Sequence, residues 1–281
     1  MNSPNTIPIA TGVMIPSIGF GTYKVNGKTT MLEAIRSAYD AGYRFIDTAA
    51  FYKNEKELGA AIATLGIARE DLFITSKVWL ENDGYDKTLK SFEKSCKDLG
   101  TDYLDLFLIH WPTERTMSTW MALERLYAEG KVRAIGVSNF DIDNLKEIVE
   151  SNHIKPMINQ IEIHPGHPQD ELRKFCDRHG IHICSSAPLG RGNIFSDPDI
   201  LQIADRNDRS PSQVVLRWHY QLGIIPIPKS LHKEHIEENI DIFDFTLSID
   251  DMQKLSSLKG SCLFKAPAGA LVSKSGEYDE A

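Results

Sequence analysis

Short apolar runs alternate with longer segments of mixed polarity along almost the whole chain. The runs are rich in Ile, Val, Leu and Phe, which is typical of parallel strands buried on both faces. We predict eight such strands, at residues 17–21, 43–47, 72–77, 104–110, 132–138, 157–162, 181–186 and 224–230. The segments after the strands place apolar residues at helical spacing, so the pattern predicts a repeated strand–helix unit.

Several predicted helices carry start or stop signals. Gly42 follows the apolar face of the first helix and is a plausible C-terminal stop. Asp86 is a candidate cap for the helix that follows the third strand. Ser210 and Pro211 are suited to the cap and the first helical position of a later helix. Two additional helices are expected, around 198–208 and 248–258.

Eight strand–helix units in 281 residues predict a closed (β/α)8 barrel, the TIM barrel. The main rival is an open doubly wound sheet, which usually has a G-x-G-x-x-G loop after its first strand. Here the first strand ends in "GFGTYKVNG", which lacks that pattern. Residues 7–16 are predicted to form a hairpin that could plug the barrel bottom. We expect one domain over residues 1–281, with a C-terminal tail at about 260–281.

Charge and cysteine content narrow the class of protein further. The formal net charge is −8 with no block of like charges, which argues against nucleic acid as a partner. The four cysteines form no C-x-x-C pair, so we expect reduced thiols. The first residues lack a secretory pattern, and no apolar run is long enough to cross a membrane. A cytoplasmic monomer acting on a small molecule is expected.

Polar residues follow three successive predicted strands. Asp47 ends the second strand, Tyr52 lies in the next loop, Lys77 ends the third strand and His110 ends the fourth. Taken singly, each has a simpler interpretation: a loop anchor, a packed ring, a surface lysine or a core histidine. Together they favour an active site, because the carboxyl ends of barrel strands meet at one mouth.

These four residues suit proton donation. The pKa of tyrosine is about 10, and a nearby ammonium favours the phenolate. We therefore expect Lys77 to lower the pKa of Tyr52, with Asp47 as the counter-charge that keeps the lysine protonated. His110 is expected to donate a hydrogen bond to a substrate oxygen and so polarise a carbonyl group.

Six motifs give the chain a family resemblance. They are "GYRFIDTAAFYKNEKELG" at 42–59, "TSKVW" at 75–79, "LDLFLIHWP" at 104–112, "AIGVSNF" at 134–140, "NQIEIHP" at 159–165 and "IPIPKS" at 225–230. On these motifs, over roughly residues 7 to 260, the chain resembles the aldo-keto reductases, and in particular their bacterial, short-loop members. The resemblance implies a barrel that binds NADPH without a metal, and a catalytic tetrad of Asp47, Tyr52, Lys77 and His110.

The resemblance also implies a cofactor groove. Ser138, Asn139 and Gln160 suit a carboxamide, although the first two also suit helix caps. Lys229 and Ser230 suit a phosphate near a helix start, and Glu238 and Asn239 match adenine-binding positions. The full set expected to bind the cofactor is Thr22, Asp47, Ser138, Asn139, Gln160, Ser186, Leu189, Lys229, Ser230, His235, Glu238 and Asn239.

Two positions depart from the family pattern. Ser186 occupies the place where many relatives have a tryptophan or tyrosine that stacks on the nicotinamide. His235 occupies the place of an arginine for the 2′-phosphate, and histidine is only partly charged near neutral pH. NADPH is still favoured, with NADH as the less favoured possibility.

The substrate side is predicted to be aromatic. Tyr23, Phe51, Trp79 and Trp111, with His110, fall beside the predicted mouth and are expected to bind substrate, although each also suits packing. His164 and His167 are assigned to loop or core roles, because the remaining ligands of a metal site are missing.

Three functions remain open from the sequence. The first is NADPH-dependent reduction of aldehydes or reactive ketones, such as dicarbonyls, aldoses and keto-sugars. The second is a cofactor-binding regulatory subunit with little turnover. The third is an aldolase that forms a Schiff base on Lys77, against which Tyr52 and the cofactor residues argue.

Overall fold

A single parallel sheet forms the centre of the molecule. This computed structural model describes residues 5–151, 154–271 and 279–280. The eight strands of the sheet follow one another in chain order, each parallel to the next. They are β3 (Phe20–Gly21), β4 (Phe45–Asp47), β5 (Phe73–Val78), β6 (Leu104–Ile109), β7 (Val132–Ser138), β8 (Ile158–Ile161), β9 (His182–Ser185) and β10 (Ile225–Pro226).

Hydrogen bonds between the first and last strands close this sheet into a barrel. The amide of Gly19 donates to the carbonyl of Pro226 at 2.9 Å, and that of Gly21 donates to Pro228 at 3.0 Å. The predicted eight strands and the (β/α)8 fold class are therefore confirmed, with each strand within a few residues of its predicted place.

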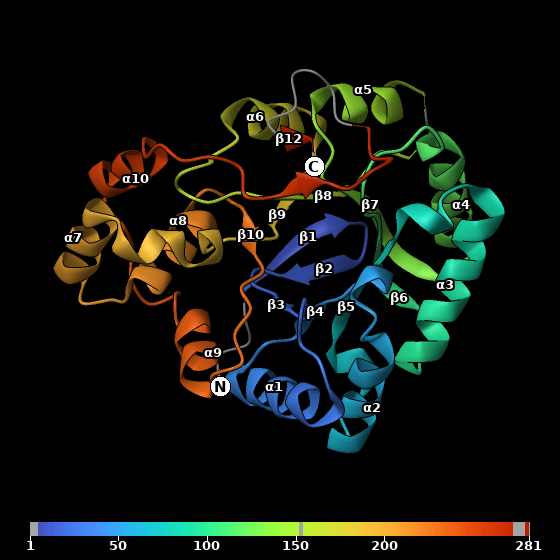
Figure 1. The fold of residues 1–281 in the computed structure, drawn as a ribbon, viewed down its shortest axis with the longest axis horizontal. Coiled ribbons are helices and arrows are strands. Elements are labelled where there is room, and N and C mark those ends of the chain that lie inside the picture. Colours follow the sequence, from blue (N-terminus) through green and yellow to red (C-terminus); the bar gives the residue numbers. More distant parts are fainter. Residues whose placement is uncertain (1–4, 152–153, 272–278, 281) are drawn as a thin grey trace.

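Helices surround the sheet (Figure 1). Those that follow the strands are α1 (Lys28–Ala41), α2 (Glu55–Leu65), α3 (Tyr85–Leu99), α4 (Thr116–Ala128), α5 (Ile142–Ser151), α6 (Asp170–His179), α8 (Pro211–Gln221) and α9 (Lys233–Ile240). The two additional helices are α7 (Pro198–Asn207) and α10 (Ile249–Ser256), as predicted. Short 3-10 turns are η1 (Ala50–Tyr52), η2 (Arg69–Asp71), η3 (Leu80–Asn82) and η4 (Gly190–Ser196). Across the described ranges, no helix combines the length and apolar character that a membrane crossing requires.

Two of the three predicted helix signals act as expected. Gly42 ends α1 in the left-handed conformation, with φ of 107°, and its amide caps the helix. Ser210 forms a capping box with Gln213 at the start of α8. The prediction for Asp86 is wrong: α3 begins at Tyr85, and Asp86 lies in its first turn without capping it. A carboxylate there still stabilises the helix dipole.

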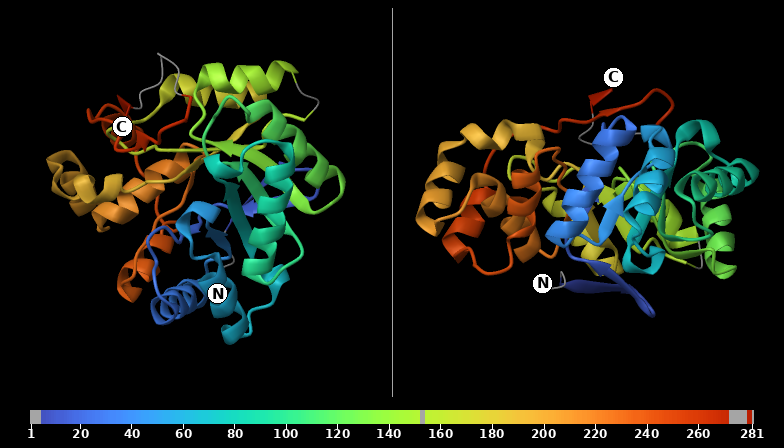
Figure 2. Two further views of the ribbon diagram at one scale, coloured as in Figure 1. Left: turned by 45° about the vertical axis from the view of Figure 1, so that its right-hand side comes forward. Right: turned by 90° about the horizontal axis from the view of Figure 1, so that it is seen from below.

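The N-terminal hairpin closes one end of the barrel. It consists of β1 (Thr6–Ala10) and β2 (Val13–Pro16), paired antiparallel. Its apolar side chains pack on the interior side chains of the strands, which confirms the predicted plug. The buried residues of this interior cluster are Ile9, Val13, Ile15, Phe45, Phe73, Leu106, Leu108, Ala134, Ile158, Cys184, Ile225 and Ile227. Figure 2 shows the hairpin and the C-terminal segment at opposite ends of the barrel.

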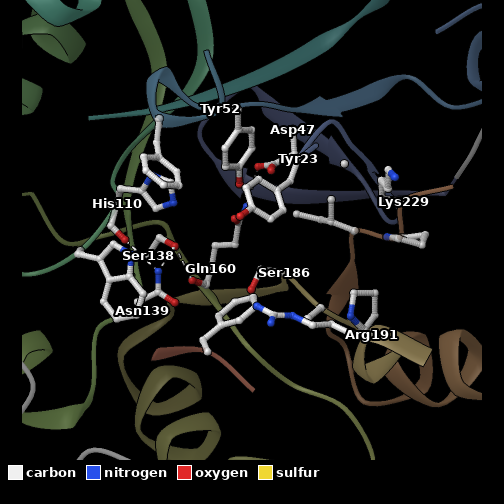
Figure 3. Close-up of a pocket in the computed structure, with 18 of the residues that line it drawn as sticks. Tyr23, Asp47, Tyr52, His110, Ser138, Asn139, Gln160, Ser186, Arg191 and Lys229 are labelled. Carbon is white, nitrogen blue, oxygen red and sulfur yellow. Dashed lines mark hydrogen bonds between the residues drawn. The ribbon is translucent and has the colours of Figure 1, made fainter. Parts of the chain in front are cut away.

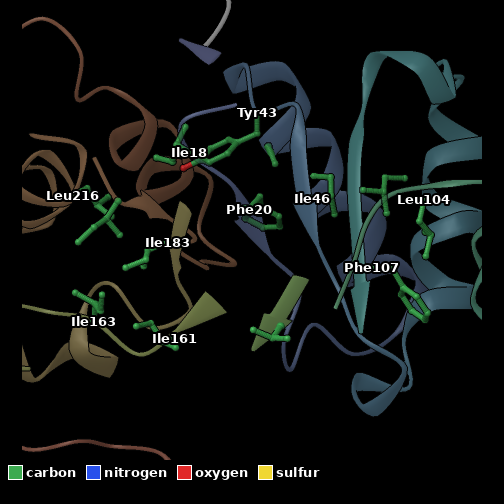
Figure 4. Close-up of a cluster of buried hydrophobic side chains, with 14 of the residues drawn as sticks. Ile18, Phe20, Tyr43, Ile46, Leu104, Phe107, Ile161, Ile163, Ile183 and Leu216 are labelled. Carbon is green, nitrogen blue, oxygen red and sulfur yellow. The ribbon is translucent and has the colours of Figure 1, made fainter. Parts of the chain in front are cut away.

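A larger apolar layer fills the space between the sheet and the helices. Figure 4 shows part of it, including Ile46 of β4 and Phe107 of β6. Tyr43 and Trp120 are among its largest side chains, and both are almost fully buried. Because successive residues of a strand point to opposite faces, each strand from β4 to β9 supplies side chains to both the interior cluster and this outer layer.

We predict that Gly59→Ala destabilises the fold, although alanine is the better helix former by about 1 kcal/mol. A Cβ atom at Gly59 in α2 lies 2.6 Å from the carbonyl oxygens of Asp98 and Leu99, and these are backbone atoms. Overpacking of this kind costs about 1–3 kcal/mol. Urea unfolding measures the change, and Ala60→Gly at an exposed position of α2 calibrates helix propensity alone. A Gly59→Ala variant more stable than the parent contradicts the prediction.

Candidate active site

A cavity of about 450 Å³ opens at the carboxyl ends of the barrel strands. Its floor brings together residues that are far apart in the sequence, among them Asp47, His110 and Gln160 (Figure 3). They meet because parallel strands in a barrel all end at the same face. The predicted strand-end residues therefore do share one mouth.

An ion pair lies beneath this floor. The Lys77 ammonium is 2.9 and 2.8 Å from the two oxygens of Asp47, and it also donates to the carbonyl of Thr48 at 3.0 Å. Lys77 is fully buried and Asp47 is 4% exposed. Gln160 donates a further hydrogen bond to Asp47 at 2.7 Å. The pair is thus fully hydrogen-bonded, which a charge pair in the interior requires.

Tyr52 contacts Lys77 of the ion pair and also lines the cavity. Its hydroxyl oxygen lies 3.3 Å from the Lys77 nitrogen. Burial raises the pKa of Tyr52, Lys77 lowers it and Asp47 raises it, and the net pKa lies above the ordinary value. The expectation of a lowered Tyr52 pKa is therefore wrong, because desolvation of the phenolate outweighs the nearby ammonium. The phenol keeps its proton at neutral pH.

Lys77 keeps its charge in this site. Burial acts to lower the pKa of Lys77, but Asp47 and Tyr52 overcome that effect and leave the pKa above its ordinary value. His110, in contrast, is neutral, because burial and the Lys77 charge hold its pKa well below the ordinary value. A neutral imidazole can donate one hydrogen bond and accept another. Its Nδ1 has no hydrogen-bond partner within the described part of the chain.

An amide and hydroxyl cluster lines the cavity beside His110. Asn139 donates to the His110 carbonyl at 2.9 Å and to the Ser138 hydroxyl at 3.1 Å. Ser138 donates to the Gln160 carbonyl at 2.8 Å. Capping of α5 is carried out instead by Asp141, whose carboxylate accepts from the Asn144 amide at 3.0 Å. Among the described atoms, the Asn139 side-chain oxygen has no partner, so it remains available as an acceptor.

The other residues predicted to bind a cofactor divide into two groups. Ser186, Leu189 and Lys229 line the cavity, whereas Thr22 lies just behind it and donates to the Asp47 carbonyl at 2.9 Å. Burial, together with Lys24, lowers the pKa of Lys229.

The second group lies outside the cavity lining, on the segment that leads into α9 and on α9 itself. The Ser230 hydroxyl accepts from the His232 amide at 3.1 Å, and the His235 ring lies 5.3 Å from that of His232. Glu238 accepts a hydrogen bond from Ser210. Asn239 is buried, and its side-chain oxygen has no partner in the described ranges.

The predicted aromatic wall is present. Phe51 and Trp79 stack with ring centroids 3.8 Å apart, and Tyr23 lies 5.0 Å from the Tyr52 ring. Phe51 and Tyr23 are 40% and 44% exposed, so they form the outer rim. Trp111 is buried and also lines the cavity. These rings give the side of the cavity near Tyr52 an apolar surface.

Arg191, Phe264, Lys265 and Pro267 are among the lining residues that the sequence analysis missed. The Arg191 guanidinium lies 4.8 Å from the centre of the Phe264 ring, which joins the loop after β9 to the C-terminal segment. Arg191 belongs to the sequence "APLGRGN" at 187–193, whose proline and glycines indicate a loop but do not mark the arginine as part of a site. The C-terminal segment has no periodic pattern that marks it as part of a site.

The histidines assigned to loop or core roles are buried and do not line the cavity. His164 is 3.1 Å from a Glu162 oxygen, and His167 is 2.7 Å from the Gln169 side chain. In the described ranges, no cluster of three or more His, Cys, Asp or Glu side chains has an arrangement that could hold a metal ion.

Comparison with known proteins matches nearly the whole barrel. The family model described as "Aldo/keto reductase family" matches residues 17–259. The glyoxal reductase of Bacillus subtilis (strain 168) is 48% identical over 255 residues, which are 90% of this chain and 92% of that protein. The crystal structure of an aldo/keto reductase from Brucella melitensis has a TM-score of 0.87 at 43% identity, covering 90% and 99% of the two chains. That of a Bombyx mori aldo-keto reductase in complex with NADP has a TM-score of 0.85 at 33% identity, covering 91% and 93%.

We predict that Lys77→Met lowers the free energy of unfolding by about 3–5 kcal/mol, because it leaves the buried Asp47 charge without its partner. The double variant Lys77→Met/Asp47→Asn is expected to recover part of that loss. Urea unfolding at pH 7 measures both. The control is Lys94→Met, which breaks the ion pair with Asp98 at a lysine side chain that is 72% exposed, where about 0–1 kcal/mol is expected. Equal losses for the single and double variants contradict the prediction.

Proposed function

Because the chain belongs to the aldo/keto reductase family, we propose that it is an NADPH-dependent oxidoreductase that reduces aldehydes or reactive ketones to alcohols. The observation that carries the proposal is the contact of 3.3 Å between the Tyr52 hydroxyl and the Lys77 ammonium, at the floor of an aromatic-lined cavity. The glyoxal reductase relative supports dicarbonyls as substrates, and the relative in complex with NADP supports the cofactor.

The cavity suits a nicotinamide cofactor. A carboxamide needs both hydrogen-bond acceptors and donors. The cavity wall offers both, from the unpartnered Asn139 oxygen, the Ser138 hydroxyl and the Gln160 amide. Lys229, at the far side of the same cavity, suits a phosphate (Figure 3). When bound, the reduced cofactor supplies the hydride that converts a carbonyl carbon to an alcohol carbon.

The remaining cofactor residues extend this groove to α9. Ser230 and His235 would hold the ribose phosphate, and Glu238 and Asn239 the adenine. Thr22, Ser186 and Leu189 would contact the cofactor along the cavity. The buried, unpartnered oxygens of Ser186 and Asn239 support this assignment, because a buried polar atom without a partner is costly unless a ligand satisfies it.

Tyr52 supplies the proton in this proposal. Its hydroxyl donates to the carbonyl oxygen of the substrate as that oxygen gains negative charge. The tyrosinate that remains is stabilised by the Lys77 ammonium, which Asp47 keeps charged. A proton from solvent then restores the phenol. The raised pKa of Tyr52 is compatible with this role, since the group must hold its proton until the oxygen becomes basic.

His110 orients the substrate. Because burial and the Lys77 charge hold the pKa of His110 well below its ordinary value, the ring is a neutral hydrogen-bond donor and not a competing acid. Its ring packs 5.9 Å from that of Tyr52 and 5.0 Å from that of Trp79. Both Tyr52 and His110 therefore face one position for the carbonyl oxygen.

The alternative functions have less support. A Schiff base on Lys77 needs a neutral amine, whereas this ammonium has a raised pKa and is held by two Asp47 oxygens. A regulatory subunit with little turnover retains support only from the departures at Ser186 and His235. Borohydride trapping distinguishes the aldolase, since an adduct on Lys77 forms only if a Schiff base does.

The experiment that tests the proposed function is a cofactor-oxidation screen. Methylglyoxal, aldoses and keto-sugars are supplied with NADPH or NADH, and the loss of absorbance at the reduced nicotinamide is followed. Turnover of at least one reactive carbonyl is expected. Tight NADPH binding without turnover of any carbonyl favours the regulatory subunit instead.

We predict that Tyr52→Phe lowers kcat by about 10²–10⁴-fold, because the variant lacks the proton donor. NADPH affinity, measured by calorimetry, is expected to stay within about threefold, since the phenol is not among the proposed cofactor residues. Tyr39→Phe serves as the matched control, because it removes a hydroxyl that is hydrogen-bonded to Asp71 at 3.3 Å and does not line the cavity. Normal turnover in Tyr52→Phe refutes the proton-donor role.

We also predict higher kcat/KM with NADPH than with NADH, because Lys229 and Ser230 are assigned to the 2′-phosphate, which NADPH carries and NADH lacks. Lys229→Met is expected to reduce this preference by about tenfold, the value of one charge-assisted hydrogen bond. Calorimetric affinities for the two oxidised cofactors give an independent measurement. Equal affinity for both in the parent enzyme excludes the assigned phosphate site.

A further inference from the structure

The C-terminal strap, residues 261–271, crosses the open end of the barrel. Figure 1 shows this segment, which includes β11 (Lys265–Ala266), passing in front of the strands that carry the site. Phe264, Lys265 and Pro267 of the strap line the cavity. One wall of the cavity therefore consists of a segment that belongs to none of the eight strand–helix units.

Glu162 holds the start of this strap. One of its oxygens accepts from the Leu263 amide at 2.6 Å, and the other accepts from the Phe264 amide at 2.8 Å. His164 lies 3.1 Å from the first oxygen and the Cys262 sulfur lies 3.5 Å from the second. Glu162 is fully buried just beyond the end of β8, two residues after Gln160. The carboxylate thus joins the strap to the strand that carries a proposed cofactor residue.

A carboxylate is suited to this position because both of its oxygens accept hydrogen bonds. Burial acts to raise the pKa of Glu162, but the hydrogen bonds from His164 and Leu263 more than offset it, so the pKa lies below the ordinary value. A glutamine in the same place has only one acceptor, and its NH₂ group would face a backbone N–H. The ionised carboxylate is therefore specifically matched to two adjacent backbone amides.

The rest of the strap is held by apolar and backbone contacts. Phe264 and Ala266 belong to a cluster with Trp79 and Trp111 of the substrate wall. Farther along, the Leu271 amide donates to the Pro112 carbonyl at 2.8 Å. Glu162 fixes the backbone of the strap at Phe264, where the strap enters the cavity. The position of the Phe264 ring beside the tryptophans depends on this backbone anchor and on the Arg191 guanidinium, which lies 4.8 Å from the ring centre.

We propose that Glu162 is a positioning residue for substrate selection, acting through Phe264. By fixing the two amides at Leu263 and Phe264, it holds the Phe264 ring as a wall that favours carbonyl substrates with an aromatic or bulky apolar substituent. Small carbonyl compounds that stay near Tyr52 and His110 do not reach this wall. The inference rests on the proposed reductase function and names a substrate class within it.

The test compares two ketoaldehydes that share the same reactive group, phenylglyoxal and methylglyoxal. In Glu162→Gln, KM for phenylglyoxal is expected to rise about tenfold or more, because the phenyl group loses apolar contacts with Phe264. KM for methylglyoxal and kcat for both are expected to stay within about twofold. An equal rise for both substrates, or no change for either, overturns the proposal.

A matched control separates positioning from general stability. Glu55 is also a buried glutamate, but it lies in α2 away from the cavity and accepts from Ser76 at 2.6 Å and Ser95 at 3.2 Å. Glu55→Gln is expected to change thermal stability without separating the two substrates. If Glu55→Gln separates them as Glu162→Gln does, the selectivity comes from loosened structure and the proposal fails.

Two further measurements test the route through Phe264. Amide hydrogen exchange at Leu263 and Phe264 is expected to accelerate in Glu162→Gln and to remain unchanged in Glu55→Gln. Phe264→Ala is expected to raise the phenylglyoxal KM, and the double variant with Glu162→Gln should show no further rise. Additive effects, or unchanged exchange, overturn the proposal. If the parent enzyme reduces no carbonyl compound of the screen, the proposed function fails. If it reduces other carbonyl compounds but neither ketoaldehyde, the substrate selection proposed here fails while the reductase function stands.

Discussion

The buried pair of Lys77 and Asp47 is the constraint on which the site depends. An ammonium with no exposed surface is tolerated only with a carboxylate and further acceptors around it, and Asp47 and the Thr48 carbonyl supply them. The pairing of β4 with β5 sets this geometry, because it aligns Asp47 with Thr75, two residues before Lys77. Tyr52 contacts Lys77 and Gln160 contacts Asp47, so both side chains are positioned by an ion pair that the strand pairing holds in place.

The alternation of side chains along the strands divides the barrel interior into two ends. In β4, Phe45 faces the hairpin and Asp47, on the same face, points to the mouth. In β8, Ile158 and Gln160 repeat this arrangement. Both strands thus carry an apolar residue at the plugged end and a polar residue at the open end, so the apolar packing lies apart from the polar residues of the cavity.

Local signals in the sequence predict most of this architecture. Apolar runs locate the eight strands, and Gly42 and Ser210 mark helix ends correctly, since these features depend on neighbouring residues. The net pKa of Tyr52 was mispredicted because it depends on burial, which no spacing reveals. The strap was missed because the bonds between Glu162 and Phe264 join residues about one hundred positions apart, with no periodic pattern at either end. Asp86 does not cap α3 because the helix begins one residue before it, at Tyr85, with Gly84 at the N-cap position.

The order of the strap in the chain has a consequence for biosynthesis. All eight barrel strands emerge from the ribosome before residues 261–271, so the strap is the last part of the cavity wall to become available for folding. A nascent chain therefore holds every strand of its scaffold before it holds the segment that completes the cavity.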